Sequence, residues 1–200
     1  GIGAAGSSGS EPNSLDIEAR GNGSTTGAGL LTATAQGDIF IAEQSGDMNV
    51  RNVLSTAGSV RLEAAENILD AMDLVDPTVP SSGEDVDAAS KKPQIDVLAH
   101  ENITLQARGD SSGASGYIGE AGNQLDIDSR RGNLAGVVSV QSRSDTYLIE
   151  TLGDLYLNTA EVLDANEAAF LTATEGSLVN AALIAGAANV RGGRVYLFAR

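Results

Sequence analysis

The sequence predicts an all-β solenoid, in which short strands stack into successive coils, and three observations lead to this prediction. Segments recur along the chain, as when Leu-Thr-Ala-Thr occurs at 31–34 and again at 171–174. Candidate strands alternate apolar and polar residues over three to five positions. The 200 residues include 24 glycines but only 4% aromatic residues. Each repeat of such a protein buries its apolar side chains only against its neighbours, so we expect a narrow core of Val, Ile, Leu and Ala.

The longest internal copy sets residues 31–50 against residues 138–157, at a constant offset of 107. It aligns three pairs of acidic residues, namely Asp38 with Asp145, Glu43 with Glu150, and Asp47 with Asp154. A second pair of segments, 13–18 and 123–128, has an offset of 110. Because the offset changes by only a few residues, we expect the loops to vary in length while the strands persist.

Strict alternation marks the individual strands. The apolar pairs that define them are Ile39/Ile41, Met48/Val50, Val60/Leu62, Ile103/Leu105, Leu155/Leu157 and Val195/Leu197. A period of two residues indicates a strand, because successive side chains then point to opposite faces. Strand starts at Gly37, Gly46, Gly58 and Glu66 are 9, 12 and 8 residues apart, which leaves no room for helices between them. Two or three strands would make a coil of about 20 residues, which predicts roughly ten coils rising about 4.8 Å each.

We interpret residues 1–200 as one continuous β-helix segment, an interior slice of a longer repeat protein. The repeat pattern includes Ile2-Gly3 at one end and Val195–Arg200 at the other. A coil without a cap exposes core side chains and unpaired strand edges. We therefore expect like segments to stack end to end.

One segment interrupts the pattern. Residues 73–93 hold three of the four prolines and lack apolar alternation. Proline cannot donate a hydrogen bond to a neighbouring strand, so this segment is predicted to project from the solenoid as a loop. We interpret it as a solvated insertion, with a cation or partner site as the alternative.

The charge and the missing residue types narrow the possible partners. Twelve basic and 27 acidic residues give a net charge of -15, which disfavours nucleic acid and anionic membrane surfaces. The absence of cysteine excludes disulfides and thiolate metal sites. No run of about 18 apolar residues is present, so we expect no membrane insertion by this segment.

Five strings in the chain are similar to the repeats of very large bacterial surface and secreted proteins of the filamentous-haemagglutinin-like kind: Ile2–Gly6, Gly37–Ile41, Glu43–Asp47, Ile68–Ala71 and Asn123–Asp128. The resemblance implies a right-handed parallel β-helix and an exported parent protein that is extracellular or on the cell surface. It also implies a role in adhesion, biofilm or fibre formation, with a host or neighbouring-cell surface or a polysaccharide as the contact. The secretion domain of that family has no counterpart here, so the export route stays open.

Parallel β-helices also include polysaccharide lyases and hydrolases, which makes the acidic residues catalytic candidates. However, Asp38, Asp47, Asp145 and Asp154 precede strands at turn positions, where aspartate commonly bonds to its own backbone. The single histidine, His100, has no second histidine or nucleophile motif beside it, and we interpret it as an exposed turn residue. We expect no catalytic residue and no cofactor, with weak calcium binding at acidic loops as the open possibility.

The aromatic residues are the most promising surface contacts. Phe40, Tyr147, Tyr156 and Tyr196 each occupy the middle of an apolar-x-apolar strand, so their rings should point outward. Outward rings can stack on sugars or on a partner, although packing between neighbouring coils is the interpretation that we favour.

Taken together, these features favour a structural or adhesive stalk with a long acidic surface, and not an enzyme. Two alternatives stay open, a carbohydrate-active β-helix enzyme and a cation-loading surface module.

Overall fold

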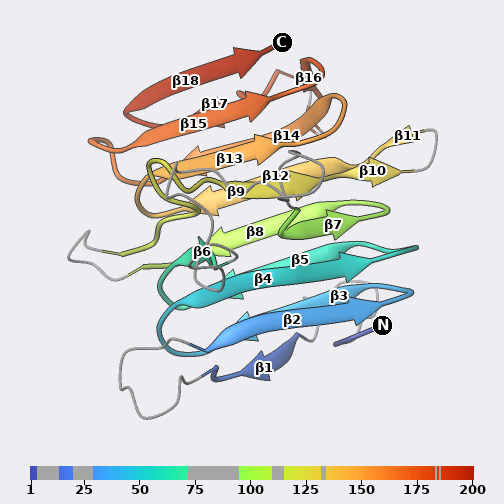
Figure 1. The fold of residues 1–200 in the computed structure, drawn as a ribbon. Helices are drawn as coiled ribbons and strands as arrows, with labels where there is room; N and C mark the ends of the chain where they lie inside the picture. The colour runs from blue at the N-terminus through green and yellow to red at the C-terminus, as the bar shows by residue number, and fades with distance from the viewer. Residues whose placement is uncertain are drawn as a thin grey trace.

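The computed structural model describes residues 1–3, 14–19, 29–71, 95–109, 115–131, 134–182, 184 and 186–200. These residues form strands and no helix, and the strands stack into about six turns of a right-handed parallel β-helix (Figure 1). The predicted fold class is therefore confirmed. The right-handed path is the one that the twist of β-strands favours for crossovers between parallel strands. The predicted loop at 73–93 lies outside the described residues.

Two parallel sheets form the walls, and the chain alternates between them. Sheet 1 contains β1 (Leu15–Ile17), β3 (Ile39–Glu43), β5 (Val60–Ala64), β8 (Ile103–Ala107), β12 (Val137–Ser142), β14 (Leu155–Val162), β16 (Leu178–Asn180) and β17 (Val190–Arg191). Sheet 2 contains β2 (Leu30–Ala35), β4 (Met48–Ser55), β6 (Ile68–Asp70), β7 (Val97–Ala99), β9 (Leu125–Asp128), β13 (Thr146–Glu150), β15 (Ala168–Ala173) and β18 (Arg194–Ala199). A separate antiparallel pair joins β10 (Arg130–Arg131) to β11 (Leu134–Ala135).

The core lies between the two sheets and is filled as the alternation predicts. Both members of five of the six apolar pairs, from Ile39/Ile41 to Leu155/Leu157, are buried in one hydrophobic cluster. The exception is the pair Val195/Leu197, which is exposed. These two residues lie on β18, an edge strand of sheet 2, so none of the described strands covers them.

The number of coils differs from the prediction, about six instead of roughly ten. Some coils have the expected length, since Ile39 pairs with Val60, 21 residues later. Others are longer, since Val60 pairs with Ile103, 43 residues later, and Ile103 pairs with Val138, 35 residues later. Backbone pairing sets the rise per coil, whereas a surface connection can lengthen at little cost in free energy. Chain length therefore does not measure the length of the solenoid.

In the longest coil, from Val60 to Ile103, two short strands take the place of one in sheet 2. Residues 48–50 of β4 pair with β6, whereas residues 53–55 pair with β7, so two pieces share one level of sheet 2. The next level is also divided, because Ile118 bridges Ile68 to Thr146 while β9 pairs with β7 and β13. Residues 71 and 95, which adjoin the interruption, therefore lie within the wall of the sheet.

The copies at an offset of 107 occupy opposite walls. The strand β3 lies in sheet 1, whereas its copy β13 lies in sheet 2, and β4 and β14 are exchanged in the same way. The offset of 107 residues therefore corresponds to a number of complete turns plus half a turn, which places the copy in the other sheet. Both walls are built from the same local pattern.

Candidate functional site

The four aspartates at strand starts bond to the following coil. Their Oδ1 atoms accept hydrogen bonds from backbone N–H groups as follows: Asp38 from Ser59 (2.9 Å), Asp47 from Asn67 (3.2 Å), Asp145 from Ala168 (2.6 Å) and Asp154 from Ser177 (2.7 Å). Each donor begins, or directly precedes, the strand that stacks next in the same sheet. We expected bonds within the aspartate's own turn, but the backbone N–H at the start of the next strand needs an acceptor, and the carboxylate supplies it.

The paired glutamates bond to the preceding coil. The Glu43 Oε2 atom accepts a hydrogen bond from the Ala19 backbone N–H (2.7 Å), just beyond β1. Glu150 accepts from the backbone N–H of Ser129 (3.2 Å) and from its hydroxyl (2.7 Å), just beyond β9. Burial raises the pKa of Glu150 to about 8, against the opposing effect of these bonds from Ser129. Both glutamates join two coils, and their copied positions have the same role.

Three further acids gather where the strands of sheet 2 are interrupted. Asp70 ends β6, Asp96 directly precedes β7, and Asp126 lies on β9. The Asp126 backbone N–H donates to Asp96 Oδ2 at 2.8 Å. Burial raises the pKa of Asp96 well above its usual range, and the charge of Asp70 and a hydrogen bond between these two side chains raise it further. Asp70 and Asp96 therefore form a buried, coupled pair of carboxyl groups in which the pKa of Asp96 is raised.

This cluster of Asp70, Asp96 and Asp126 was not predicted, because Asp70 and Asp96 belong to no aligned pair and Asp126 is aligned only with Asp16, in the copies at an offset of 110. A carboxyl with a raised pKa beside a second carboxyl is an arrangement that acid–base catalysis can use. In this structure, however, all three side chains are buried, and Asp96 is only 1% exposed. A polysaccharide has no access to them in this arrangement.

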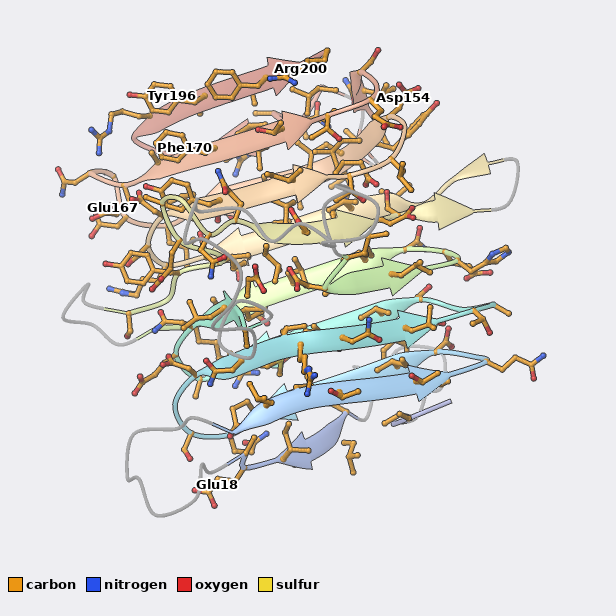
Figure 2. All side chains as sticks on the ribbon, viewed as in Figure 1. Glu18, Asp154, Glu167, Phe170, Tyr196 and Arg200 are labelled. Atoms are coloured by element: carbon orange, nitrogen blue, oxygen red, sulfur yellow. The ribbon has the colours of Figure 1, made fainter. Side chains whose placement is uncertain are left out.

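Aromatic side chains form a ladder on the outer face of sheet 2. The rings of Tyr147 and Phe170 stack with their centroids 4.5 Å apart, and Tyr196 stacks on Phe170 at the same distance (Figure 2). We call Tyr147, Phe170 and Tyr196 the aromatic ladder. Phe170 is therefore stacked on both of its faces, whereas Tyr147 and Tyr196 are each stacked on it by one face. Phe170 was not predicted, although it alternates with Ala169 and Leu171 as the other outward rings do.

The aromatic ladder is hydrogen-bonded to Asp145, one of the aspartates that bond to the start of the next strand. The Tyr147 hydroxyl donates to Asp145 Oδ2 at 3.1 Å. Burial and the neighbouring charge of Asp145 raise the pKa of Tyr147 to about 12. A hydrogen bond between the side chains of Glu167 and Asp145 raises the pKa of Glu167, which directly precedes β15. The same few residues therefore cap a strand and position a ring.

Removing the middle ring tests the ladder. Phe170→Ala removes both stacked pairs, and we expect it to lower the free energy of unfolding by ~1–3 kcal/mol beyond the loss of burial. The pKa of Tyr147 should also fall toward its ordinary value, because its ring loses cover. Denaturant unfolding and ultraviolet titration of tyrosine measure the two effects. Thr172→Ala, on the same face of β15, is the control and should change neither quantity appreciably; equal effects from both variants would contradict the ladder.

The other two predicted contacts lie on the opposite wall. Tyr156 is on β14, half-buried, and its hydroxyl lies 3.4 Å from Asp154 Oδ2. Phe40 is on β3 and differs from the expectation of an accessible ring, because it is only 9% exposed. Phe40 is absent from the core cluster that contains Ile39 and Ile41, so it is covered on the outer side of the wall. The four predicted residues therefore do not form one surface.

Sheet 1 carries a polar counterpart of the aromatic ladder. Gln106 donates to Gln141 (2.9 Å), Gln141 donates to Glu161 (3.1 Å), and Glu161 forms an ion pair with Arg191 (3.5 Å). These residues face one another in register on β8, β12, β14 and β17. We call Gln106, Gln141, Glu161 and Arg191 the polar ladder. Each member bonds to the coil above or below it.

A groove lies beside the aromatic ladder, near the last strands of sheet 2. Its volume is about 460 Å³, and its lining includes Gln124, Ile149, Thr172, Thr174, Phe198 and Arg200. The lining combines hydroxyl, amide and guanidinium groups with an aromatic ring. Such a surface suits a ligand that has both polar and apolar faces, as sugars do.

The described residues contain no group of three or more His, Asp or Glu side chains placed to hold a metal ion. His100 lies in a bend after β7, half-buried, and its backbone N–H donates to the Ser55 carbonyl. In the part of the chain that the structure describes, no helix has the length and apolar character needed to cross a membrane. No protein-family model, curated protein or solved structure matches this chain.

Proposed function

We propose that this chain is a structural and adhesive stalk segment of a large extracellular or cell-surface bacterial protein, of the filamentous-haemagglutinin-like kind. The observation that supports this proposal is the direction in which the outward polar and aromatic side chains are bonded. The aromatic ladder on sheet 2 and the polar ladder on sheet 1 both connect coil to coil along the axis. These contacts stiffen an elongated scaffold, as a stalk requires.

The acidic residues support the same function. Asp38, Asp47, Asp145 and Asp154 each hold the start of a strand in the following coil. The net charge of -15 opposes side-by-side association of such scaffolds, so the molecule can extend from a surface without clumping. The groove beside the aromatic ladder is the place where we expect a glycan of a host or neighbouring cell to bind.

Electron microscopy of the producing cells, with an antibody raised against this segment, tests the proposal. Label along thin fibres or an outer layer is the expected result, because a stalk has to reach beyond the cell envelope. Cells that lack the gene are the control for antibody specificity. Label confined to the cytoplasm would contradict the proposal.

Activity measurements separate the stalk from its alternatives. A stalk segment should leave acidic polysaccharides intact, and turnover of any of them by the purified chain would favour the enzyme. Calcium titration followed by thermal melting tests the cation-loading module, since an ion that binds the folded state selectively raises the melting temperature. We expect no rise beyond that produced by an equal ionic strength of sodium.

A further inference from the structure

The two short strands that share one level of sheet 2 meet at an interruption in the middle of the wall. β6 and β7 lie in line along β4, with β6 ending at Asp70 and Asp96 directly preceding β7 (Figure 1). Asp70 pairs with Val50 of β4, and the Val53 backbone N–H donates to the Asp96 carbonyl at 2.7 Å. Because residues 71–95 separate Asp70 from Asp96 in the sequence, contacts across the interruption have to join the two strands at this level.

Carboxyl groups supply these contacts. The side chains of Asp70 and Asp96 are hydrogen-bonded to each other across the interruption. On β9, the next strand of the sheet, the Asp126 backbone N–H donates to Asp96 Oδ2 at 2.8 Å, and the Asp126 carbonyl accepts from the Asp96 backbone N–H at 3.0 Å. Asn123 Nδ2, just before β9, donates to the Asp70 carbonyl at 3.1 Å. The pair therefore connects β6, β7 and β9.

The charges around the pair are mostly negative. On the strands packed against it, the charged residues besides the pair are Arg51 on β4, which is exposed, and Asp126 and Asp128 on β9, which are buried. None of the described buried residues is basic. Ionising both Asp70 and Asp96 would place like charges side by side where water has little access. A hydrogen bond between two carboxyl groups also needs a proton on one of them, because an ionised carboxylate only accepts.

We propose that Asp70 and Asp96 form a pH-sensitive junction in the wall of the solenoid, which one shared proton holds together and which separates locally when that proton passes to the solvent. We call these two residues the carboxyl junction. Separation moves the end of β6 and the start of β7 apart, while the strands of sheet 1 stay stacked. It leaves backbone groups of β4 near residues 50–53 without their partners, so another strand or a protease can reach them. The proposal concerns local conformation and does not depend on the stalk proposal.

The sign of the pH dependence follows from the two states of the carboxyl junction. In the joined state, burial and the charge of Asp70 raise the pKa of Asp96 well above its usual range. In the separated state both side chains are hydrated, and a hydrated aspartate has a pKa of about 3.9. Between these two values the joined state holds a proton that the separated state has released, so a rise in pH favours separation by up to ~tenfold per pH unit. The junction is therefore stable in acid and weakens toward neutral pH.

Hydrogen exchange of the whole chain between pH 5 and pH 8, followed by mass spectrometry of its peptides, tests this proposal. Protection factors are compared, because division by the intrinsic exchange rate removes the direct effect of pH on exchange. Peptides that cover β6 and β7 report separation of the junction, and peptides that cover β12 and β14 in sheet 1 report global unfolding. The protection of β7 relative to β14 should fall as the pH rises, by up to ~tenfold per pH unit.

Variants assign this fall to the carboxyl junction. The amide of Asp96→Asn keeps an oxygen for the Asp126 N–H and a donor for Asp70 but does not titrate, so the relative protection of β7 should no longer depend on pH. Asp70→Asn is the reciprocal variant and should have the same effect. Glu150→Gln is the control, because Glu150 is buried in the same sheet but bonds to Ser129. Far-ultraviolet dichroism checks that each variant is folded.

The relative protection of β7 should fall with pH in the unmodified chain and in Glu150→Gln, and stay constant in the two asparagine variants. A constant value in the unmodified chain would overturn the proposal, since separation would then release no proton. The same fall in a folded Asp96→Asn variant would overturn it as well, because another group would be titrating. If neither asparagine variant folds, the unmodified chain and Glu150→Gln decide the matter: a fall confined to β6 and β7 in both supports the junction, and its absence from either rejects it.

Discussion

Replacing Ile41 or Leu157 with aspartate is expected to lower the free energy of unfolding by several kcal/mol. Both side chains lie in the buried cluster between the sheets, and none of the described buried residues is basic. A charge placed in such a site loses its hydration without gaining a counter-ion. Denaturant unfolding followed by far-ultraviolet dichroism measures the loss. An aspartate variant that is already unfolded without denaturant also agrees with this prediction, provided that the control variant Tyr156→Ser folds.

Tyr156→Ser is the matched control, because Tyr156 neighbours Leu157 on β14 and points to the other face. We expect it to cost about 1 kcal/mol or less, as for other partly exposed pairs between strands. Phe40→Ser, which the alternation alone would place in the same class, should cost more, since Phe40 is almost fully covered. Equal losses from Leu157→Asp and Tyr156→Ser would contradict the assignment of the two faces.

Raising the pH from about 5 to about 8 is expected to destabilise the folded chain, which is unusual for a protein rich in carboxylates. Glu150 has a pKa of about 8 in the folded state, and the pKa of Asp96 is also raised. In this pH window the folded state holds protons that the unfolded state has already released. Each such proton lowers the free energy of unfolding by about 1.4 kcal/mol per pH unit, until the pH passes the pKa of the folded state. Denaturant unfolding at several pH values measures this slope.

Two substitutions assign the slope to its source. Glu150→Gln keeps the shape of the side chain but removes its titration, so it should flatten the slope and leave the protein at least as stable as the unmodified chain near the upper end of the range. Ser129→Ala removes the hydroxyl that stabilises the charged form of Glu150, so it should cost more stability at high pH than at low pH. The same slope in Glu150→Gln as in the unmodified chain would show that Glu150 is not the group responsible.

The position of the groove beside the aromatic ladder depends on the stacking of coils, and sequence alone does not reveal it. Ile149, Thr172 and Phe198 line the groove from three different strands, with 23 residues separating Ile149 from Thr172 and 26 separating Thr172 from Phe198. The place of Phe170 in the aromatic ladder also depends on the stacking of coils. Its outward direction follows from alternation, but its partners follow from the register between β13, β15 and β18.

The sequence by itself determined the strands, their inward faces and the solenoid class, because these depend on a period of two residues and on short-range repetition. The turn positions of Asp38 and its counterparts also indicated a structural role, although their hydrogen bonds run to the next coil and not within their own turn. Only the tertiary structure decided the number of coils, the half turn between β3 and β13, the cover over Phe40 and the meeting of Asp70 with Asp96. Each of these features depends on which residues of neighbouring coils lie in register. That register is set by connections of unequal length between the strands, which produce no periodic pattern in the sequence.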